Sequence, residues 1–258
     1  YQIPSTYAEL IHTMQQIKKA GKLPIVFADK DSWTIHQGWD AIDMSSRGSQ
    51  DNLFQNVLNG TTVLYEDPIA LDSTRKFLEI RQYGQKQTIN TGYDEAVKKF
   101  AKGEAYMFLQ GNWAYPIIKK INPYMDLLFM PFPTYKENQA RVVAKIDATL
   151  GVSAFCKHPE AAEKFLDYVF SKNVSEYYAN QAGAYSCIKS VDVADNYAKV
   201  FTDSISSGEF FLEEFAYESE KSNARDALFQ NLTSSPQTYT ERAFLKEWND
   251  LLILQKGA

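Results

Sequence analysis

Short apolar runs that alternate with amphipathic helical stretches constrain the fold of this chain more than any other feature. LPIVFA at 23–28 and AYMFLQG at 105–111 have the length and composition of buried strands. A strong helix signal precedes the first run, because Thr6 and Glu9 have the spacing of a capping box and Gly21 follows the apolar stripe. Strands that alternate with helices along the sequence predict an α/β protein.

Periodicity predicts most of the remaining elements. Four more stretches have helical spacing: 67–85, 91–104, 112–121 and 157–171. Asn112 is well suited to cap the third of these helices. The fourth should direct four residues toward a core: Ala162, Phe165, Leu166 and Val169. Residues 148–155 alternate like a strand, and the last third of the chain, from residue 209, is mostly helical in pattern.

Composition indicates an ordinary globular protein. The chain has 258 residues, of which 45% are hydrophobic and 23% are charged, and this balance argues against disorder. No apolar run approaches the ~18 to 20 residues that a membrane-spanning helix needs. The net charge of -5 and the pI near 5.3 argue against a nucleic-acid-binding surface, because such surfaces cluster Lys and Arg. We therefore expect no nucleic-acid partner.

Cysteines and histidines give no pattern of a metal or cofactor site. Cys156 and Cys187 lack the CxxC spacing, and the sequence leaves open whether they form a disulfide. His12, His36 and His158 are scattered, whereas a zinc site needs about three or four converging ligands. The sequence also lacks a Gly-rich phosphate loop and a GxSxG motif. We expect neither a metal nor another cofactor.

Two carboxylates follow the first predicted strand. Asp29 and Asp31 flank Lys30, and three interpretations of this pair stay open. The carboxylates could bond to the local backbone of a turn. They could bind hydroxyl groups of a ligand, or they could perform acid/base chemistry on a glycoside. A spacing of two residues within a loop does not decide among the three.

Two tryptophans occupy similar positions after predicted strands. Trp33 and Trp113 each follow a strand end and a turn, outside any periodic apolar stripe. An aromatic face at such a place can stack on the C–H face of a sugar ring, while nearby carboxylates and amides bind the hydroxyl groups. Position alone leaves core packing and ligand stacking equally open for Trp113.

Several motifs in a fixed order carry a resemblance to a known family. The segments are STYAELIHTMQQIKKAGKLPIVF, DEAVKKFAKGEAYMFLQGNWAYP, MPFPTY and DATLGVSAFCKHPEAAEKFLDYVF. Together they resemble the extracellular solute-binding proteins of ABC sugar importers, of the maltodextrin-binding type. The resemblance extends from Thr6 to about Ser190, and the order of the motifs is more specific than any one of them.

This resemblance implies a set of ligand-binding residues. The Trp of the family's GxW turn stacks on bound sugar, and here it is Trp113, preceded by Asn112. The loop that supplies an acidic and an aromatic residue corresponds to Asp31 and Trp33. The segment before the family's return strand lies near the hinge, so Asp147 is expected to reach the ligand.

The resemblance also implies a periplasmic-binding-protein-like fold of type II, with two lobes joined by a hinge. We expect residues 1–143 and 191–258 in a C-terminal-type lobe, and residues 144–190 to return to the other lobe, which is largely incomplete here. Family members usually carry a long additional segment upstream, so the start at YQIPSTYAEL is typical of a mature or truncated chain. The sequence departs from the family's pattern at Tyr7, where Trp is usual, and at Lys145, where a Gly pair often begins.

The expected function is the substrate-binding component of an ABC importer, which captures a sugar or oligosaccharide by cleft closure and delivers it to a membrane permease. It would be a non-enzymatic monomer outside the cell, lipid-anchored or periplasmic. The alternatives are a carbohydrate-active hydrolase that uses Asp29 or Asp31, and the same binding fold with a non-sugar solute.

Overall fold

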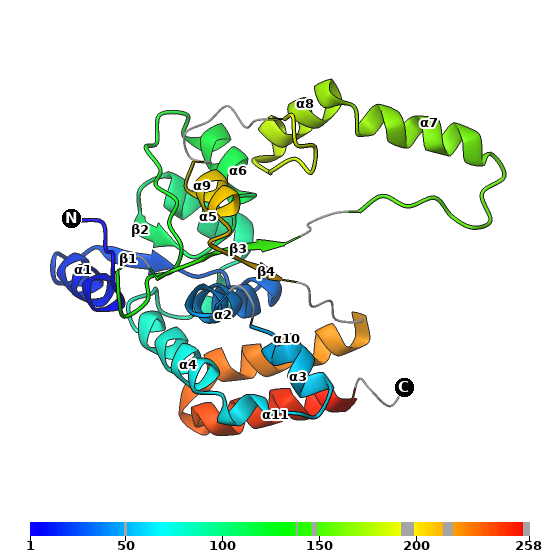
Figure 1. Ribbon diagram of the computed structural model, residues 1–258. Helices are drawn as coiled ribbons and strands as arrows, with labels where there is room; N and C mark the ends of the chain where they lie inside the picture. The colour runs from blue at the N-terminus through cyan, green and yellow to red at the C-terminus, as the bar shows by residue number, and fades with distance from the viewer. Residues whose placement is uncertain (49–50, 138, 146–148, 192–198, 214–218, 255–258) are drawn as a thin grey trace.

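The computed structural model is a helix-rich α/β structure and describes residues 1–48, 51–137, 139–145, 149–191, 199–213 and 219–254 (Figure 1). Its helices are α1 (Tyr7–Lys19), α2 (Trp33–Ser46), α3 (Leu53–Leu58), α4 (Pro68–Arg81), α5 (Tyr93–Ala101), α6 (Ala114–Ile121), α7 (Pro159–Val169), α8 (Lys172–Ala182), α9 (Lys199–Ser207), α10 (Ser219–Ser234) and α11 (Glu241–Ile253). Its strands are β1 (Leu23–Val26), β2 (Ala105–Phe108), β3 (Val142–Lys145) and β4 (Phe210–Glu213).

Strands β1 and β2 form a parallel pair, with Leu23 opposite Ala105 and Val26 opposite Phe108. They are the two strands that the apolar runs predict. A parallel pair needs a crossover connection, and the chain between these strands folds into helices α2 to α5. The predicted α/β class is therefore confirmed.

Helix α1 begins as the sequence predicts. Thr6 Oγ1 accepts a hydrogen bond from the Glu9 backbone N–H at 3.3 Å, and Glu9 Oε2 accepts one from the Thr6 N–H at 3.2 Å. The two bonds complete the capping box and satisfy backbone donors that the first turn leaves free. Gly21, just beyond the helix, has a φ of +72°, which glycine adopts without steric cost.

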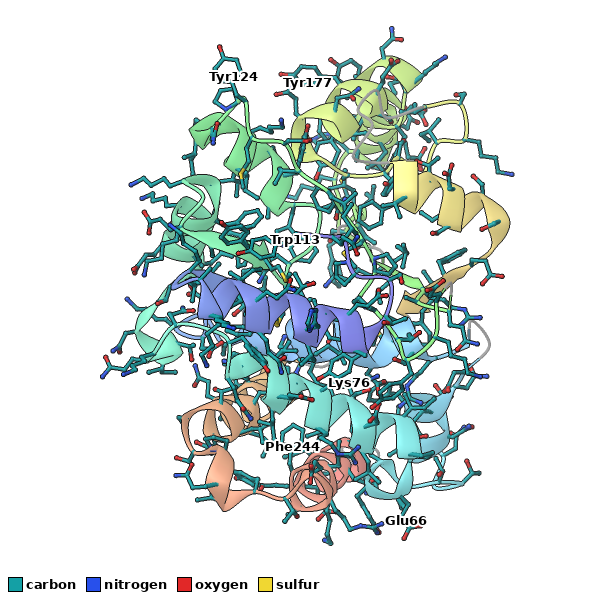
Figure 2. All side chains as sticks on the ribbon, turned by 90° about the vertical axis from the view of Figure 1, so that its left-hand side faces the viewer. Glu66, Lys76, Trp113, Tyr124, Tyr177 and Phe244 are labelled. Atoms are coloured by element: carbon teal, nitrogen blue, oxygen red, sulfur yellow. The ribbon has the colours of Figure 1, made fainter. Side chains whose placement is uncertain are left out.

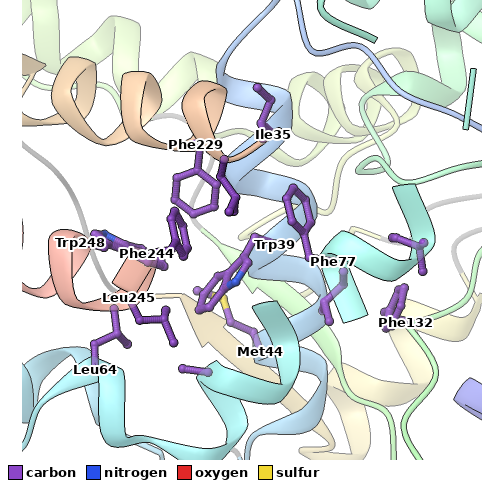
Figure 3. Close-up of a cluster of buried hydrophobic side chains, with 14 of the residues drawn as sticks. Ile35, Trp39, Met44, Leu64, Phe77, Phe132, Phe229, Phe244, Leu245 and Trp248 are labelled. Carbon is purple, nitrogen blue, oxygen red and sulfur yellow. The ribbon is translucent and has the colours of Figure 1, made fainter. Parts of the chain in front are cut away.

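The main core lies among α2, α4, α10 and α11, where aromatic rings from distant parts of the sequence meet (Figure 3). Trp39 and Trp248 are almost fully buried, and their ring centroids lie 4.7 Å apart at an interplanar angle of 78°. The indole N–H of Trp39 donates to Thr74 Oγ1 at 3.0 Å, so its polar atom is also satisfied. Trp39 is therefore a core residue, and this core supports the helix that Trp33 begins.

Strands β3 and β4 form a second parallel pair, with Val142 opposite Phe210 and Lys145 opposite Glu213. The prediction that residues from 209 onward are mostly helical is therefore wrong at β4, although α10 and α11 confirm it further on. A strand of four residues, of which three are apolar, is too short for periodicity to separate strand from helix.

Two expectations between residues 148 and 171 are also wrong. Residues 149–155 form no strand, because alternation stabilises a strand only beside a partner, and no described strand pairs with them. Helix α7 forms as predicted but buries none of its residues, and Phe165 is 59% exposed. The helix projects from the body of the structure, so no described segment covers its apolar face (Figure 1).

Cys156 and Cys187 are both free thiols. Within the described ranges, none of the helices combines the length and the apolar character that crossing a membrane requires.

Candidate functional site

The candidate site lies at the carboxyl ends of β1 and β2. Because the two strands are parallel, the chain leaves both at the same edge of the pair, through residues 27–32 and 109–113. In open α/β structures this edge is where ligands commonly bind. The tryptophans that the sequence singles out both lie here, Trp33 as the first residue of α2 and Trp113 directly before α6.

The two tryptophans are neighbours. The ring centroids of Trp33 and Trp113 lie 6.3 Å apart at an interplanar angle of 57°. Trp33 is 37% exposed, which is unusual for so large an apolar side chain, and Trp113 is half-buried. Trp113 lies near the middle of the structure, between Tyr124 and Tyr177 on one side and Phe244 on the other (Figure 2). The pair thus presents partly exposed aromatic surface at the strand ends.

Tyr93 is a third aromatic residue of the site, and it lies within the stretch 91–104 that the sequence predicts to be helical. Its ring centroid lies 5.1 Å from that of Trp33. Burial raises the pKa of the Tyr93 hydroxyl to about 12, the charge of Asp94 adds to the rise, and the indole N–H of Trp113 opposes it. Tyr93 therefore stays neutral at physiological pH, and its ring packs beside Trp33. The sequence signal for a site role of Tyr93 is its place directly after Gly92, at the first residue of a predicted helix.

Gly111 sets the position of the Trp113 ring. A Cβ atom on Gly111 would overlap three consecutive atoms of the six-membered ring of Trp113. A point so close to three consecutive ring atoms lies over the face of the ring rather than at its edge. The backbone of Gly111 therefore packs against one face of Trp113, and a larger residue at 111 would displace the indole.

Asp31 caps a helix from a distance. Its Oδ2 accepts a hydrogen bond from the backbone N–H of Tyr93, at 2.6 Å, at the N-terminus of α5. A carboxylate is favourable there because the first N–H groups lack partners and the helix dipole is positive at this end. Asp31 thus joins the loop after β1 to the helix that carries Tyr93.

Asp29 is a structural residue in this arrangement. It is 1% exposed and forms an ion pair with Arg81 of α4. The cavity beside the pair, also lined by Gln110, measures only about 10 Å³, which is about the size needed for one water molecule. A substrate cannot reach this carboxylate, so Asp29 and Asp31 do not form an accessible catalytic pair.

Asn112 does not cap α6, because the residue at the N-cap position is Trp113, whose side chain forms no capping hydrogen bond. Instead, Asn112 Nδ2 donates to the backbone carbonyl of Gly183, at the C-terminus of α8. The bond ties the turn that carries Trp113 to a distant segment. The predicted cap is wrong because a tertiary hydrogen bond takes the side chain.

Asp147 lies outside the described residues. Lys145, at the end of β3, is described, and its Nζ lies 5.7 Å from the centroid of the Trp113 ring, within cation–π range. Among the described residues, no group of three or more His, Cys, Asp or Glu side chains could hold a metal ion.

A family comparison matches residues 1–176 to the model of the bacterial extracellular solute-binding proteins. A multiple sugar-binding protein of Streptococcus mutans is 26% identical over 194 residues, which cover 73% of this chain and 46% of that protein. An ABC transporter extracellular-binding protein of Pyrococcus horikoshii is 26% identical over 166 residues, or 64% of this chain and 36% of that protein. The chain thus aligns with less than half of the length of each.

Solved structures show the same fold. RafE of Streptococcus pneumoniae, in complex with raffinose, has a TM-score of 0.79 at 20% identity, over 99% of this chain and 67% of that one. A chitin oligosaccharide binding protein has a TM-score of 0.82 at 17% identity, over 100% of this chain and 66% of that one. A Bacillus licheniformis sugar transporter in complex with stachyose has a TM-score of 0.76 at 19% identity, over 96% and 66%. The expected periplasmic-binding-protein-like fold of type II is confirmed.

Proposed function

This chain belongs to the bacterial extracellular solute-binding proteins, and from that premise we propose that it is the substrate-binding component of an ABC importer for a sugar or oligosaccharide. One observation carries the proposal. Trp33 and Trp113, from loops far apart in sequence, lie 6.3 Å apart at the carboxyl ends of a parallel strand pair, the edge at which open α/β structures commonly bind ligands.

The chemistry of this aromatic pair suits a sugar. A pyranose ring has an apolar C–H face that stacks on an indole, and its hydroxyl groups need polar partners around the rim. Tilted rings, such as these at 57°, offer surfaces to successive or bent sugar units. The proposed polar partners are Asp31 through its second oxygen, Asn112 through its side-chain carbonyl, and Asp147.

The names of the similar proteins support this ligand class. The relative from Streptococcus mutans is called a multiple sugar-binding protein, and the similar structures contain raffinose or stachyose or are named for chitin oligosaccharides. The same binding fold with a non-sugar solute is the alternative to this ligand class.

In this proposal the protein binds the sugar and does not hydrolyse it. Glycoside hydrolysis needs two carboxyl groups that flank the scissile bond. Asp29 is buried in its ion pair with Arg81, and Asp31 accepts from the Tyr93 N–H, which leaves neither free to act as such a pair.

The remaining features of the proposal concern the whole protein. Residues 1–143 and 191–258 would form one lobe, residues 144–190 would return to the other, and β3 and β4 would cross between them. Closure of the lobes around the sugar would produce the form that a permease recognises. The protein would act as a monomer outside the cell, lipid-anchored or periplasmic.

A thermal-shift screen of the full-length protein against raffinose, stachyose, chitin oligosaccharides and galactose tests the proposal. A sugar at a concentration of 100 times its Kd should add about 2.7 kcal/mol of stability, or roughly 5 to 10 °C in Tm. Glycerol at the same concentration controls for nonspecific stabilisation. The absence of a specific shift with every sugar, or release of chromophore from chromogenic glycosides, would contradict the proposed function.

A further inference from the structure

Lys145 is the residue at which the second strand pair approaches the aromatic site. It is the last residue of β3, its side chain is exposed, and its Nζ lies 5.7 Å from the centroid of Trp113. Its neighbour across the strand pair in the backbone register is Glu213 of β4. Lys145 is thus a charged group in contact with the ring on which the proposed function depends.

Access to Trp113 is limited. The Gly111 backbone packs against one face of its six-membered ring, so a sugar must use the opposite face. Trp33 lies beside this ring, with the two ring centroids 6.3 Å apart at an interplanar angle of 57°. An ammonium group within cation–π distance of the ring therefore competes for the surface that a sugar would use.

We propose that Lys145 sets the sugar affinity of the site by covering Trp113 in the unliganded protein and leaving the ring when a sugar stacks. This inference rests on the proposed function. Lys145 is exposed, and a cation–π contact at an exposed site is weak, so the contact is readily displaced and lowers the affinity only by its own small free energy. Release of the ammonium from the ring costs little free energy, because Lys145 is already exposed and solvent hydrates the freed group.

Competition between Lys145 and a sugar for the Trp113 ring should change the sugar affinity by a measurable amount. Removal of the ammonium should free the ring and strengthen sugar binding by about two- to fivefold, the range that corresponds to an exposed cation–π contact. Lys145→Met keeps an unbranched apolar stem and removes the charge. Lys145→Arg keeps a cation that also binds aromatic faces, so its affinity should stay near that of the wild type. Lys22→Met, at another exposed lysine, controls for the loss of one surface charge.

Two measurements on the full-length protein test the inference. Isothermal titration calorimetry uses the sugar that gives the largest thermal shift. Fluorine NMR uses protein labelled with 5-fluorotryptophan, with the Trp113 signal assigned through Trp113→Phe. In the absence of sugar, Lys145→Met should shift the Trp113 signal, whereas Lys22→Met should leave it in place. With sugar, only Lys145→Met should strengthen binding.

Three results would overturn the inference: an unchanged Trp113 signal in Lys145→Met, an unchanged affinity, or a weakened affinity, which would mean that Lys145 binds the sugar directly. If the wild type binds sugar with the same affinity as Lys145→Met, the inference fails and the proposed function stands. If neither the wild type nor any variant binds a sugar, the proposed function fails, and with it the effect of Lys145 on sugar affinity. The NMR signal still decides whether Lys145 covers Trp113.

Discussion

The ring centroids of Trp33 and Trp113 lie 6.3 Å apart because the strands that precede the two residues are parallel neighbours. Val26 pairs with Phe108 at the ends of β1 and β2, and each tryptophan follows within a short turn. Tyr93 lies against Trp33, and Gly111 lies against Trp113, so both indoles are held in place by described contacts. A rigid aromatic surface lowers the entropy that ligand binding costs.

Replacement of Gly111 by Ala should weaken sugar binding by about tenfold or more, while the protein stays folded. The added methyl would overlap the Trp113 ring and push it out of position. Calorimetry with the best sugar ligand measures the effect. Gly48→Ala is a matched control, because a Cβ at Gly48 meets nothing within 4 Å. Equal affinities of the two variants would show that the position of Trp113 does not matter.

Replacement of Asp31 by Ala should lower the free energy of unfolding by about 1 kcal/mol, the usual cost of losing a helix cap. The reason is the loss of the 2.6 Å bond to the Tyr93 N–H. Asp31→Asn keeps an acceptor oxygen and should lose only part of that stability. Urea denaturation of the three proteins gives the values. A loss of binding in Asp31→Ala with unchanged stability would contradict the capping role.

The buried pair of Asp29 and Arg81 leads to a non-additive prediction. Arg81→Met leaves the Asp29 carboxylate buried without its partner, and this should cost about 3 to 5 kcal/mol. Adding Asp29→Asn removes the uncompensated charge and should recover much of the loss. Urea midpoints of both single variants and the double variant form the required cycle. Strict additivity would rule out the interpretation of Asp29 as a structural residue.

Tyr93 predicts a loss of stability at high pH. Its pKa is about 12 in the folded protein and about 10 in an unfolded chain, so its contribution is complete below pH 10 and is lost as the pH rises toward 12. Between pH 9 and pH 11 the wild type should lose up to about 1 kcal/mol more than Tyr93→Phe, with allowance for solvent screening. Parallel urea titrations at the two pH values measure this difference, and identical losses would contradict the buried hydroxyl.

Local signals predicted the framework of the fold. The capping box of Thr6 and Glu9, the apolar runs of β1 and β2, and the periodicity of α4 and α5 all depend on residues close in sequence. The positions of Trp33 and Trp113 after strand ends follow from the same local signals, whereas their contact depends on the pairing of β1 with β2.

Long-range contacts explain what the sequence did not predict. Asn112 bonds to Gly183 instead of capping α6, and Tyr93 belongs to the site because α5 packs beside the loop after β1. The apolar residues of α7 predict a buried face, yet burial depends on a partner, and no described segment lies on it. A local sequence pattern shows that a side chain can form a hydrogen bond or pack in a core, whereas the tertiary structure determines which residue is its partner.

The most direct test of the central claim is a calorimetric titration of wild type, Trp113→Phe and Trp113→Ala with the sugar selected by the thermal-shift screen. Sugar stacking predicts that Trp113→Ala weakens binding by one or more kcal/mol, about tenfold at 1.4 kcal/mol, with Trp113→Phe in between. Thermal unfolding without sugar should show all three proteins folded, because Trp113 is half-buried at the edge of a small cluster. Unchanged affinity in Trp113→Ala, or loss of its folded state, would contradict the stacking role.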